Sequence, residues 1–175
     1  MKKALIVVDM QQDFINGSLG CDSARAIVDT VKQRIATCKQ AGYDLIFTRD
    51  IHASDYLETQ EGRHLPIVHC QAGEAGSEIA GELQEHIDSD TVIIDKSGFG
   101  SIELATTLQR ANYEQVEICG LVTNICVLFA AVLAKTALPE AEIVVNEHYT
   151  ASYDHALHAK TLDVLAGAQV TVIRV

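Results

Sequence analysis

Short apolar runs alternate with longer amphipathic stretches along this chain. The runs are rich in Val and Ile and lie at about residues 4–8, 44–49, 91–95, 115–120, 141–146 and 169–174. Most of them are apolar on both faces, which is typical of strands in a parallel sheet that helices cover on both sides. We therefore predict a strand at each of these positions.

Stretches with a helical period lie between the runs, at about residues 23–41, 76–86, 101–110, 124–136 and 154–167. Ser23 is placed to cap the first of these helices, and Gly42 is placed to end it. Alternating strands and helices imply right-handed crossovers. The predicted fold is a single doubly wound α/β domain over residues 1–175, with a mostly parallel six-stranded sheet and helices on both faces.

Residues 52–73 do not follow this rhythm. They are predicted to form a long loop, and long loops in compact domains tend to be functional. Whether this loop acts as a lid is left open.

Composition narrows the class of protein. A chain of 175 residues, 48% of them hydrophobic, can bury a sizeable core, which argues against disorder. The net charge of −11 argues against nucleic acid as a partner. No apolar stretch reaches the ~20 residues that span a bilayer, and the first run is too short for a signal peptide. Five cysteines without a CxxC pair favour reduced thiols, so we expect a cytoplasmic protein.

Residues capable of chemistry follow four of the apolar runs. Asp9 follows the first run, and Asp50 and His52 follow the second. Lys96 follows the third, and Cys126 lies shortly after the fourth. In an open parallel sheet, ligands bind outside the carboxyl ends of the strands. If these strands are neighbours, one crevice holds an acid, an ammonium group, a thiol and potential metal ligands.

Cys126 lies at the predicted start of a helix. The helix dipole and a nearby Lys96 both favour the thiolate of a group whose ordinary pKa is ~8.5. Backbone N–H groups of the same turn can form an oxyanion hole, and Asp9 can take the thiol proton and return it to a leaving amine. Each residue also has an ordinary interpretation. Cys126 can be a small core residue, Lys96 a surface lysine and Asp9 a carboxylate that caps a turn. Three other cysteines are predicted to lie in the core: Cys38, Cys70 and Cys119.

A second group of residues points to a metal ion. Asp50 and His52 are two residues apart at a strand end and so point the same way, and His69 can return from the long loop. One carboxylate and two imidazoles suit Zn²⁺ or a related divalent ion with open positions. Spacing alone does not single them out, because the chain holds seven histidines. The other five lack converging partners and are predicted to lie at the surface or on helix faces: His64, His86, His148, His155 and His158.

Taken together, these residues resemble the isochorismatase-like cysteine hydrolases, and among them the nicotinamidases. The resemblance covers essentially the whole chain and rests above all on the order Asp, Lys, Cys at the strand ends. Its motifs are Val8-Asp9-Met10-Gln11-Gln12-Asp13-Phe14, Thr48-Arg49-Asp50-Ile51-His52, Pro66-Ile67-Val68-His69-Cys70, Lys96 and Gly120-Leu121-Val122-Thr123-Asn124-Ile125-Cys126-Val127.

The resemblance implies a catalytic triad of Asp9, Lys96 and Cys126. It also implies a cis peptide at Leu121-Val122, which would direct the N–H groups of Val122 and Cys126 at an oxyanion. The implied reaction is hydrolysis of a carboxamide through a thioester on Cys126. Asp9 would protonate the departing ammonia, and water activated by Asp9 or by a metal would release the carboxylate.

The resemblance further implies that Asp50, His52 and His69 bind a divalent metal ion. Zn²⁺ is expected first, with Mn²⁺, Fe²⁺ or Mg²⁺ as alternatives, and the ion would hold the pyridine nitrogen of nicotinamide. Relatives often form homodimers or homotetramers, so a homo-oligomer is expected.

The chain departs from the nicotinamidase pattern near the expected substrate. Nicotinamidases commonly carry tryptophans near the positions of Ile51 and Leu65-Pro66, whereas this chain has none. The run from the proline to His69 is also one residue longer than usual.

The pocket is expected to include Phe14, Leu19 and Phe99. An aromatic substrate ring can face Phe14, Phe99 or Tyr56, although the same residues can serve only in packing. Nicotinamide is the first expected substrate, and another small amide or ureido compound is the rival. Two further alternatives remain: vinyl-ether hydrolysis of the isochorismatase type, and a non-catalytic binding protein on the same fold.

Overall fold

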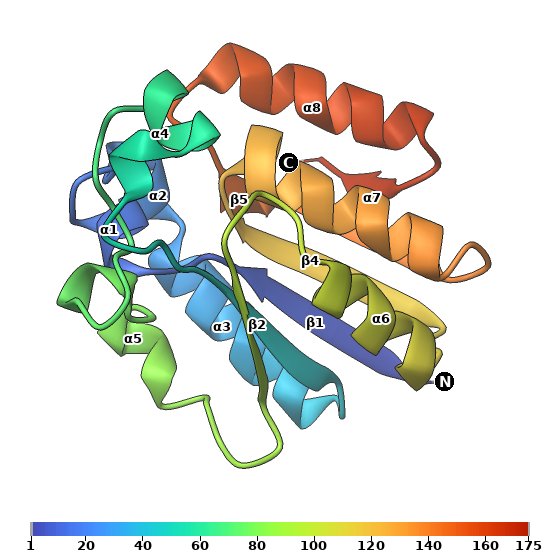
Figure 1. The fold of residues 1–175 in the computed structure, drawn as a ribbon. Coiled ribbons are helices and arrows are strands. Elements are labelled where there is room, and N and C mark those ends of the chain that lie inside the picture. Colours follow the sequence, from blue (N-terminus) through green and yellow to red (C-terminus); the bar gives the residue numbers. More distant parts are fainter. Residues whose placement is uncertain (1, 175) are drawn as a thin grey trace.

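A six-stranded sheet forms the centre of the computed structural model, which describes residues 2–174 (Figure 1). In spatial order its strands are β3 (Val92–Lys96), β2 (Asp44–Asp50), β1 (Lys3–Val8), β4 (Gln115–Leu121), β5 (Glu142–Ala151) and β6 (Thr171–Ile173). All neighbouring strands are parallel. The predicted doubly wound α/β fold is therefore confirmed, although β5 is longer than expected.

The strand order reverses beside β1. The chain adds β2 and β3 on one side of β1, and then returns to place β4, β5 and β6 on the other side. Val8 is level with Thr48 of β2 and with Gly120 of β4, so the three strands end close together. Connections that diverge at such a point leave a crevice at the carboxyl ends of the strands, where ligands bind.

Two layers of helices cover the sheet (Figure 1). Alternate residues of a strand face opposite sides. Ala4, Ile6 and Val8 of β1 therefore pack in one core, whereas Leu5 and Val7 pack in the other. The first core includes residues of α6 (Ile102–Ala111), α7 (Leu128–Ala137) and α8 (His155–Gly167), and the second includes residues of α2 (Asp22–Ala26), α3 (Val28–Gln40) and α5 (Gly81–Gln84).

The helix predicted at residues 23–41 is divided at Ile27 into α2 and α3. Ser23 does not cap it, because Cys21 stands at the N-cap of α2 and the Ser23 hydroxyl donates to the carbonyl of Ser152 at 2.8 Å. Gly42 ends α3 as predicted. It has a φ of +76°, and its N–H donates to the carbonyl of Lys39.

The helix predicted at residues 76–86 is wrong. The segment holds a 3₁₀ turn at Ala75–Ser77 and the four-residue α5, and the chain between them is extended. The reason is tertiary: Ile79 pairs with Gln11, and Ala80 N–H donates to the carbonyl of Met10 at 2.9 Å. The predicted loop at residues 52–73 in turn contains a 3₁₀ turn at Tyr56–Glu58 and a short helix, α4 (Gln60–His64).

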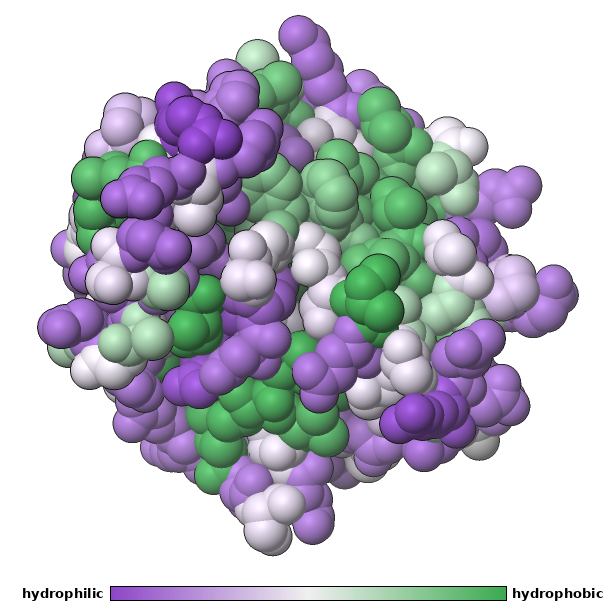
Figure 2. All heavy atoms as spheres, in the orientation of Figure 1, coloured by the Kyte–Doolittle hydropathy of each residue, from purple (hydrophilic) through white to green (hydrophobic). Residues whose placement is uncertain are grey.

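Apolar side chains also lie on the surface of the helical layer. Figure 2 shows them gathered over α7, beside the more hydrophilic α4. Phe129 and Val132 of α7 and Leu157 and Val164 of α8 are among the exposed ones. The expected homo-oligomer stays a prediction. No helix within residues 2–174 is long and apolar enough to cross a membrane.

Candidate active site

The strand ends bring the predicted chemical groups together. The Lys96 ammonium lies 2.7 Å from Asp9 Oδ2, 3.6 Å from Cys126 Sγ and 3.7 Å from Asp50 Oδ1. All four residues are buried. Lys96 also donates to the carbonyl of Gly98 at 3.0 Å. One cation is therefore shared by two carboxylates and a thiol.

Asp9 is held in place by its backbone and by its neighbour on β2. It follows β1 with a φ of +48°, a conformation that is uncommon for a residue other than glycine and is found mainly at functional sites. Its N–H donates to the carbonyl of Thr48 at 3.2 Å, and the Thr48 hydroxyl donates to Asp9 Oδ1 at 2.6 Å. The carboxylate thus has a hydroxyl on one oxygen and the Lys96 ammonium beside the other.

Cys126 lies in a short π-helical turn, Thr123–Val127, that leads into α7. Such turns often occur at functional sites. The peptide bond Leu121–Val122 just before the turn is cis, as the resemblance implied. Val122 and Cys126 both line one cavity at this edge of the sheet.

Burial controls the protonation of this cluster. It raises the pKa of Cys126 well above the ordinary value, and the negative charge of Asp9 adds to this effect, whereas Lys96 opposes it. Lys96 thus favours the thiolate, whereas burial and the charge of Asp9 favour the protonated thiol. Burial also raises the pKa of Asp9, against the lowering effect of Lys96.

Lys96 itself stays charged. Burial lowers its pKa, but the negative charges of Asp9, Cys126 and Asp50 outweigh burial and raise it overall. A thiol and a carboxylate that are buried together and both have raised pKa values are a pair between which a proton can be transferred.

A group of potential metal ligands lies beside the thiol. Asp50 Oδ2 is 2.9 Å from His52 Nε2 and 3.4 Å from His69 Nε2, and Glu61 Oε1 is 3.9 and 4.0 Å from the same two nitrogens. The four ligand atoms all lie within 4.8 Å of one another. Two imidazoles and two carboxylates are a donor set that suits Zn²⁺ and related divalent ions.

The ligand group is oriented from behind. His69 Nδ1 donates to the carbonyl of Ile67 at 2.8 Å, which orients the ring so that His69 Nε2 points toward the group. Burial raises the pKa of Asp50, but the hydrogen bonds from His52 and His69, together with Lys96, hold it well below its usual range.

Glu61 is the ligand candidate that the sequence analysis missed. It belongs to α4, inside the stretch predicted to be a loop. Thr59 caps this helix by accepting the N–H of Gly62 at 3.0 Å, and a threonine before an acidic residue is a signal that could have located the helix. No local signal says that Glu61 points toward the imidazoles.

Tyr56, one of the residues expected to face a substrate ring, does not line the cavity that Cys126 and Val122 line. Its buried ring packs against the imidazoles, with centroid distances of 4.6 Å to His52 and 4.9 Å to His69. Its hydroxyl donates to the carbonyl of Leu65 at 3.0 Å. Tyr56 therefore supports the ligand group from outside the cavity.

Gln11 holds the end of β2 in position. Its buried amide donates to the carbonyls of Asp50 and Ser77, both at 2.8 Å, and accepts the N–H of Asp50 at 2.7 Å. Asp13, in the same motif, accepts the N–H of Cys70 at 2.7 Å and so holds the residue after His69.

Gln11→Leu is expected to destabilise the fold by about 3 kcal/mol or more, because each buried backbone group left without a partner costs ~1–3 kcal/mol. Urea unfolding of the variant measures this cost. Gln33→Leu, at an exposed position of α3, is the matched control and should change stability by less than about 0.5 kcal/mol. Equal unfolding midpoints for the two variants would contradict the role given to Gln11.

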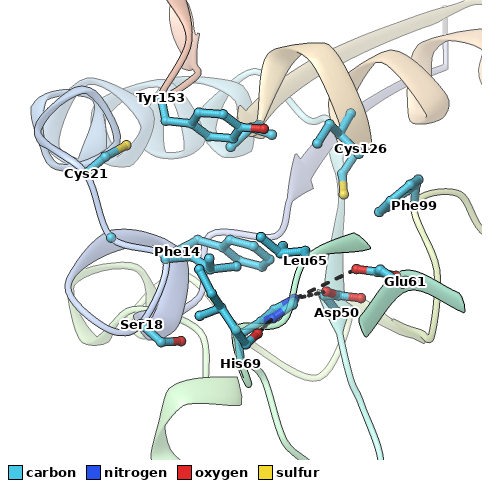
Figure 3. Close-up of a pocket in the computed structure, with 15 residues that line it drawn as sticks. Phe14, Ser18, Cys21, Asp50, Glu61, Leu65, His69, Phe99, Cys126 and Tyr153 are labelled. Carbon is cyan, nitrogen blue, oxygen red and sulfur yellow. Dashed lines mark hydrogen bonds and ion pairs between the residues drawn. The ribbon is translucent and has the colours of Figure 1, made fainter. Parts of the chain in front are cut away.

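A cavity of about 370 Å³ connects the thiol with the ligand group (Figure 3). The predicted pocket residues Phe14, Leu19 and Phe99 all line it. No lysine or arginine is among its lining residues within the described part of the chain. The lining consists of Phe14, Ser18, Leu19, Gly20, Cys21, Asp50, Glu61, Leu65, Ile67, His69, Phe99, Val122, Ile125, Cys126 and Tyr153.

Among the histidines placed outside the site, His158 has partners after all. It is half-buried on α8, and its Nδ1 lies 2.8 Å from the hydroxyl of Thr123, in the turn that carries Cys126. The residues that meet there are 35 positions apart, so no local pattern predicts the contact.

Comparison with known proteins agrees with this arrangement. The family model "Isochorismatase domain" matches residues 3–175. Nicotinamidase 3 of Arabidopsis thaliana is 26% identical over 93% of this chain and 80% of its own length. The crystal structure of nicotinamidase/pyrazinamidase PncA from Bacillus subtilis has a TM-score of 0.87 and 29% identity, covering 99% of this chain and 100% of that one.

The pyrazinamidase of Pyrococcus horikoshii, solved in complex with zinc, has a TM-score of 0.86 and 26% identity, with both chains fully covered. These likenesses extend over nearly the whole chain. The chain therefore belongs to the isochorismatase family of hydrolases.

Proposed function

We propose that the protein is a cysteine amidohydrolase that converts nicotinamide to nicotinate and ammonia. The observation that carries this proposal is that one cavity is lined both by Cys126 and by three of the four ligand candidates, Asp50, Glu61 and His69. Lys96, paired with Asp9, lies against the thiol. The nicotinamidase and pyrazinamidase relatives support the same substrate class.

The charge of the cavity favours a neutral substrate. Its walls are largely apolar, and its charged lining residues, Asp50 and Glu61, are acidic. Lys96 is already shared by Asp9 and Asp50. Nicotinamide is neutral, whereas isochorismate and ureido acids carry carboxylates that would find no basic partner here. Phe14 and Phe99 supply the aromatic faces that tryptophans would otherwise provide.

Asp50, His52, Glu61 and His69 would hold a divalent metal ion, Zn²⁺ in the first place. When bound, such an ion would supply a Lewis acid able to attract a lone pair of the substrate, such as that of the pyridine nitrogen. Cys126, on the wall of the same cavity, would face the carboxamide.

The chain's own residues carry the proton and the acyl group. As Cys126 Sγ attacks the carboxamide carbon, Asp9 takes the thiol proton, and the N–H groups of Val122 and Cys126 stabilise the oxyanion. Asp9 then gives this proton to the departing nitrogen, which leaves as ammonia, and a thioester remains on Cys126. Water attacks the thioester carbon while Asp9 accepts one of its protons, and the C–S bond breaks. Asp9 returns this proton to the sulfur of Cys126, and the nicotinic acid formed loses its proton to solvent and leaves as nicotinate. Lys96 keeps the charge balance of the cluster throughout.

Release of ammonia by the purified protein tests this function. Nicotinamide is expected to be hydrolysed, and a chelator is expected to slow the reaction. N-Carbamoylglycine, an anionic ureido acid, should be at least tenfold poorer in kcat/KM. Preference for the ureido acid would replace the proposed substrate by its rival, and no turnover of either compound would overturn the proposal.

Glu61→Gln is expected to weaken zinc binding by about 10–100-fold, because it removes one carboxylate from the ligand group. Competition with a chromophoric chelator measures the affinity without any substrate. Glu58→Gln, which changes an exposed side chain just before α4, is the control. The same zinc affinity in both variants would remove Glu61 from the ligand set.

The five cysteines are all free thiols, and the proposed reaction needs one of them reduced. A reducing compartment fits both observations. We therefore keep the cytoplasm as the proposed location.

A further inference from the structure

A chain of hydrogen bonds lies beneath the turn that carries Cys126. The hydroxyl of Thr150 donates to the carbonyl of Gly120 at 2.9 Å. The hydroxyls of Thr123 and Thr150 are 2.8 Å apart, and His158 Nδ1 is 2.8 Å from the hydroxyl of Thr123. Both threonines are buried.

Only one direction of donation gives each of these three hydrogen bonds both a donor and an acceptor. The Gly120 carbonyl can only accept, so the single hydroxyl proton of Thr150 is committed to it. Thr150 must then accept from Thr123, which in turn must accept from a proton on His158 Nδ1. The donor at the start of the chain is therefore His158, a residue of α8 that does not line the cavity.

The chain ties together four elements that meet at the nucleophile. Gly120 belongs to β4, Thr150 to β5 and His158 to α8, while Thr123 begins the π-helical turn. Glu147 Oε1 lies 3.7 Å from His158 Nε2, on the far side of the imidazole. The imidazole is thus placed between a carboxylate and the turn.

We propose that His158 is a positioning residue for the nucleophile turn, acting through the hydroxyl of Thr123. The inference rests on the proposed function for the reaction that His158 serves, but the hydrogen bonds that position the turn do not depend on a substrate. Without the donor, the hydroxyls of Thr123 and Thr150 lose their fixed order, and the turn can shift Cys126 Sγ and the Val122 N–H relative to the cavity. A misplacement of about 1 Å costs about 10²-fold in rate.

The test compares side chains of similar size with and without a donor. His158→Leu is expected to lower kcat by about 10–100-fold and to change KM less than about twofold, because His158 itself does not line the cavity. His158→Asn, whose amide can donate from the position of Nδ1, is expected to recover most of the lost kcat. His155→Leu, at an exposed position of the same helix, is the control and should leave kcat unchanged.

Thr123 gives an independent arm in case His158→Leu does not fold. Thr123→Val should lower kcat as His158→Leu does. Thr123→Ser, which keeps the hydroxyl, should keep kcat close to that of the wild type. Combining Thr123→Val with His158→Leu should add little to either single loss, since both break the same chain. Full kcat in His158→Leu and Thr123→Val, or losses that simply multiply and that His158→Asn does not recover, would overturn the proposal.

Alkylation of Cys126 by iodoacetamide separates this inference from the proposed function. If the wild type does not hydrolyse nicotinamide, the proposed function fails, yet the alkylation rates can still be compared. A rate that changes at least threefold in His158→Leu and returns in His158→Asn supports the positioning role. Equal rates in wild type, His158→Leu and Thr123→Val contradict it.

Discussion

Replacing Cys126 by alanine is expected to lower kcat for nicotinamide hydrolysis by roughly 10⁴-fold or more, because the nucleophile is lost. The fold should survive, since the side chain is small and Val127 and Ala130 of the same hydrophobic core are buried themselves. Zinc affinity should stay within about threefold of the wild type, because Cys126 is not one of the four ligand candidates.

Cys38→Ala is the matched control for the loss of a thiol. Cys38 is also a buried cysteine, but it lies in the core between the sheet and α3. The substitution Cys38→Ala should lower stability and leave kcat per folded molecule unchanged. Ammonia release by Cys126→Ala at more than about 1% of the wild-type rate would mean that water attacks the amide directly and that the thioester mechanism is wrong.

Asp9→Asn is expected to lower kcat by about 10²–10⁴-fold while making Cys126 easier to alkylate. The rate falls because the amide cannot take the thiol proton or return it to ammonia. The pKa of Cys126 falls because the negative charge of Asp9, which raises it, is removed, while the lowering effect of Lys96 remains. The midpoint of alkylation against pH should therefore move to lower pH.

These opposite changes are the specific sign of a base, since a merely damaged site would lose both activities. Hydrolysis and iodoacetamide alkylation are measured on the same preparation over a range of pH. Asp95→Asn is the control at an exposed position of β3, the strand that ends with Lys96. An alkylation midpoint in Asp9→Asn at or above that of the wild type would contradict the electrostatic account of the cluster.

The candidate site depends on residues that differ in how visible they are in the sequence. Asp9, Lys96 and Cys126 could be predicted because each follows an apolar run, and the ends of parallel strands meet at one edge of the sheet. Glu61 could not, because its contribution depends on α4 lying beside His52, just beyond the end of β2, which no local pattern encodes. His158 was predicted to lie at the surface or on a helix face, and its contact with Thr123 was missed for the same reason.

Tertiary pairing also overrode a local helical signal. Residues 76–86 have a helical period, yet the backbone around Ile79 pairs with Gln11 instead. That pairing belongs with the hydrogen bonds by which Gln11 holds Asp50. A segment whose backbone serves the site in this way cannot be predicted from its own side chains.

The sequence by itself determined the α/β alternation, the six strands and the family, because apolar period and motif spacing are local properties of the chain. Only the tertiary structure decided the strand order, the fourth ligand candidate and the burial of Cys126. The physical reason is that convergence and desolvation depend on residues far apart in the chain. The sequence predicts Lys96 near the thiol, but only the folded structure buries the thiol and so raises its pKa.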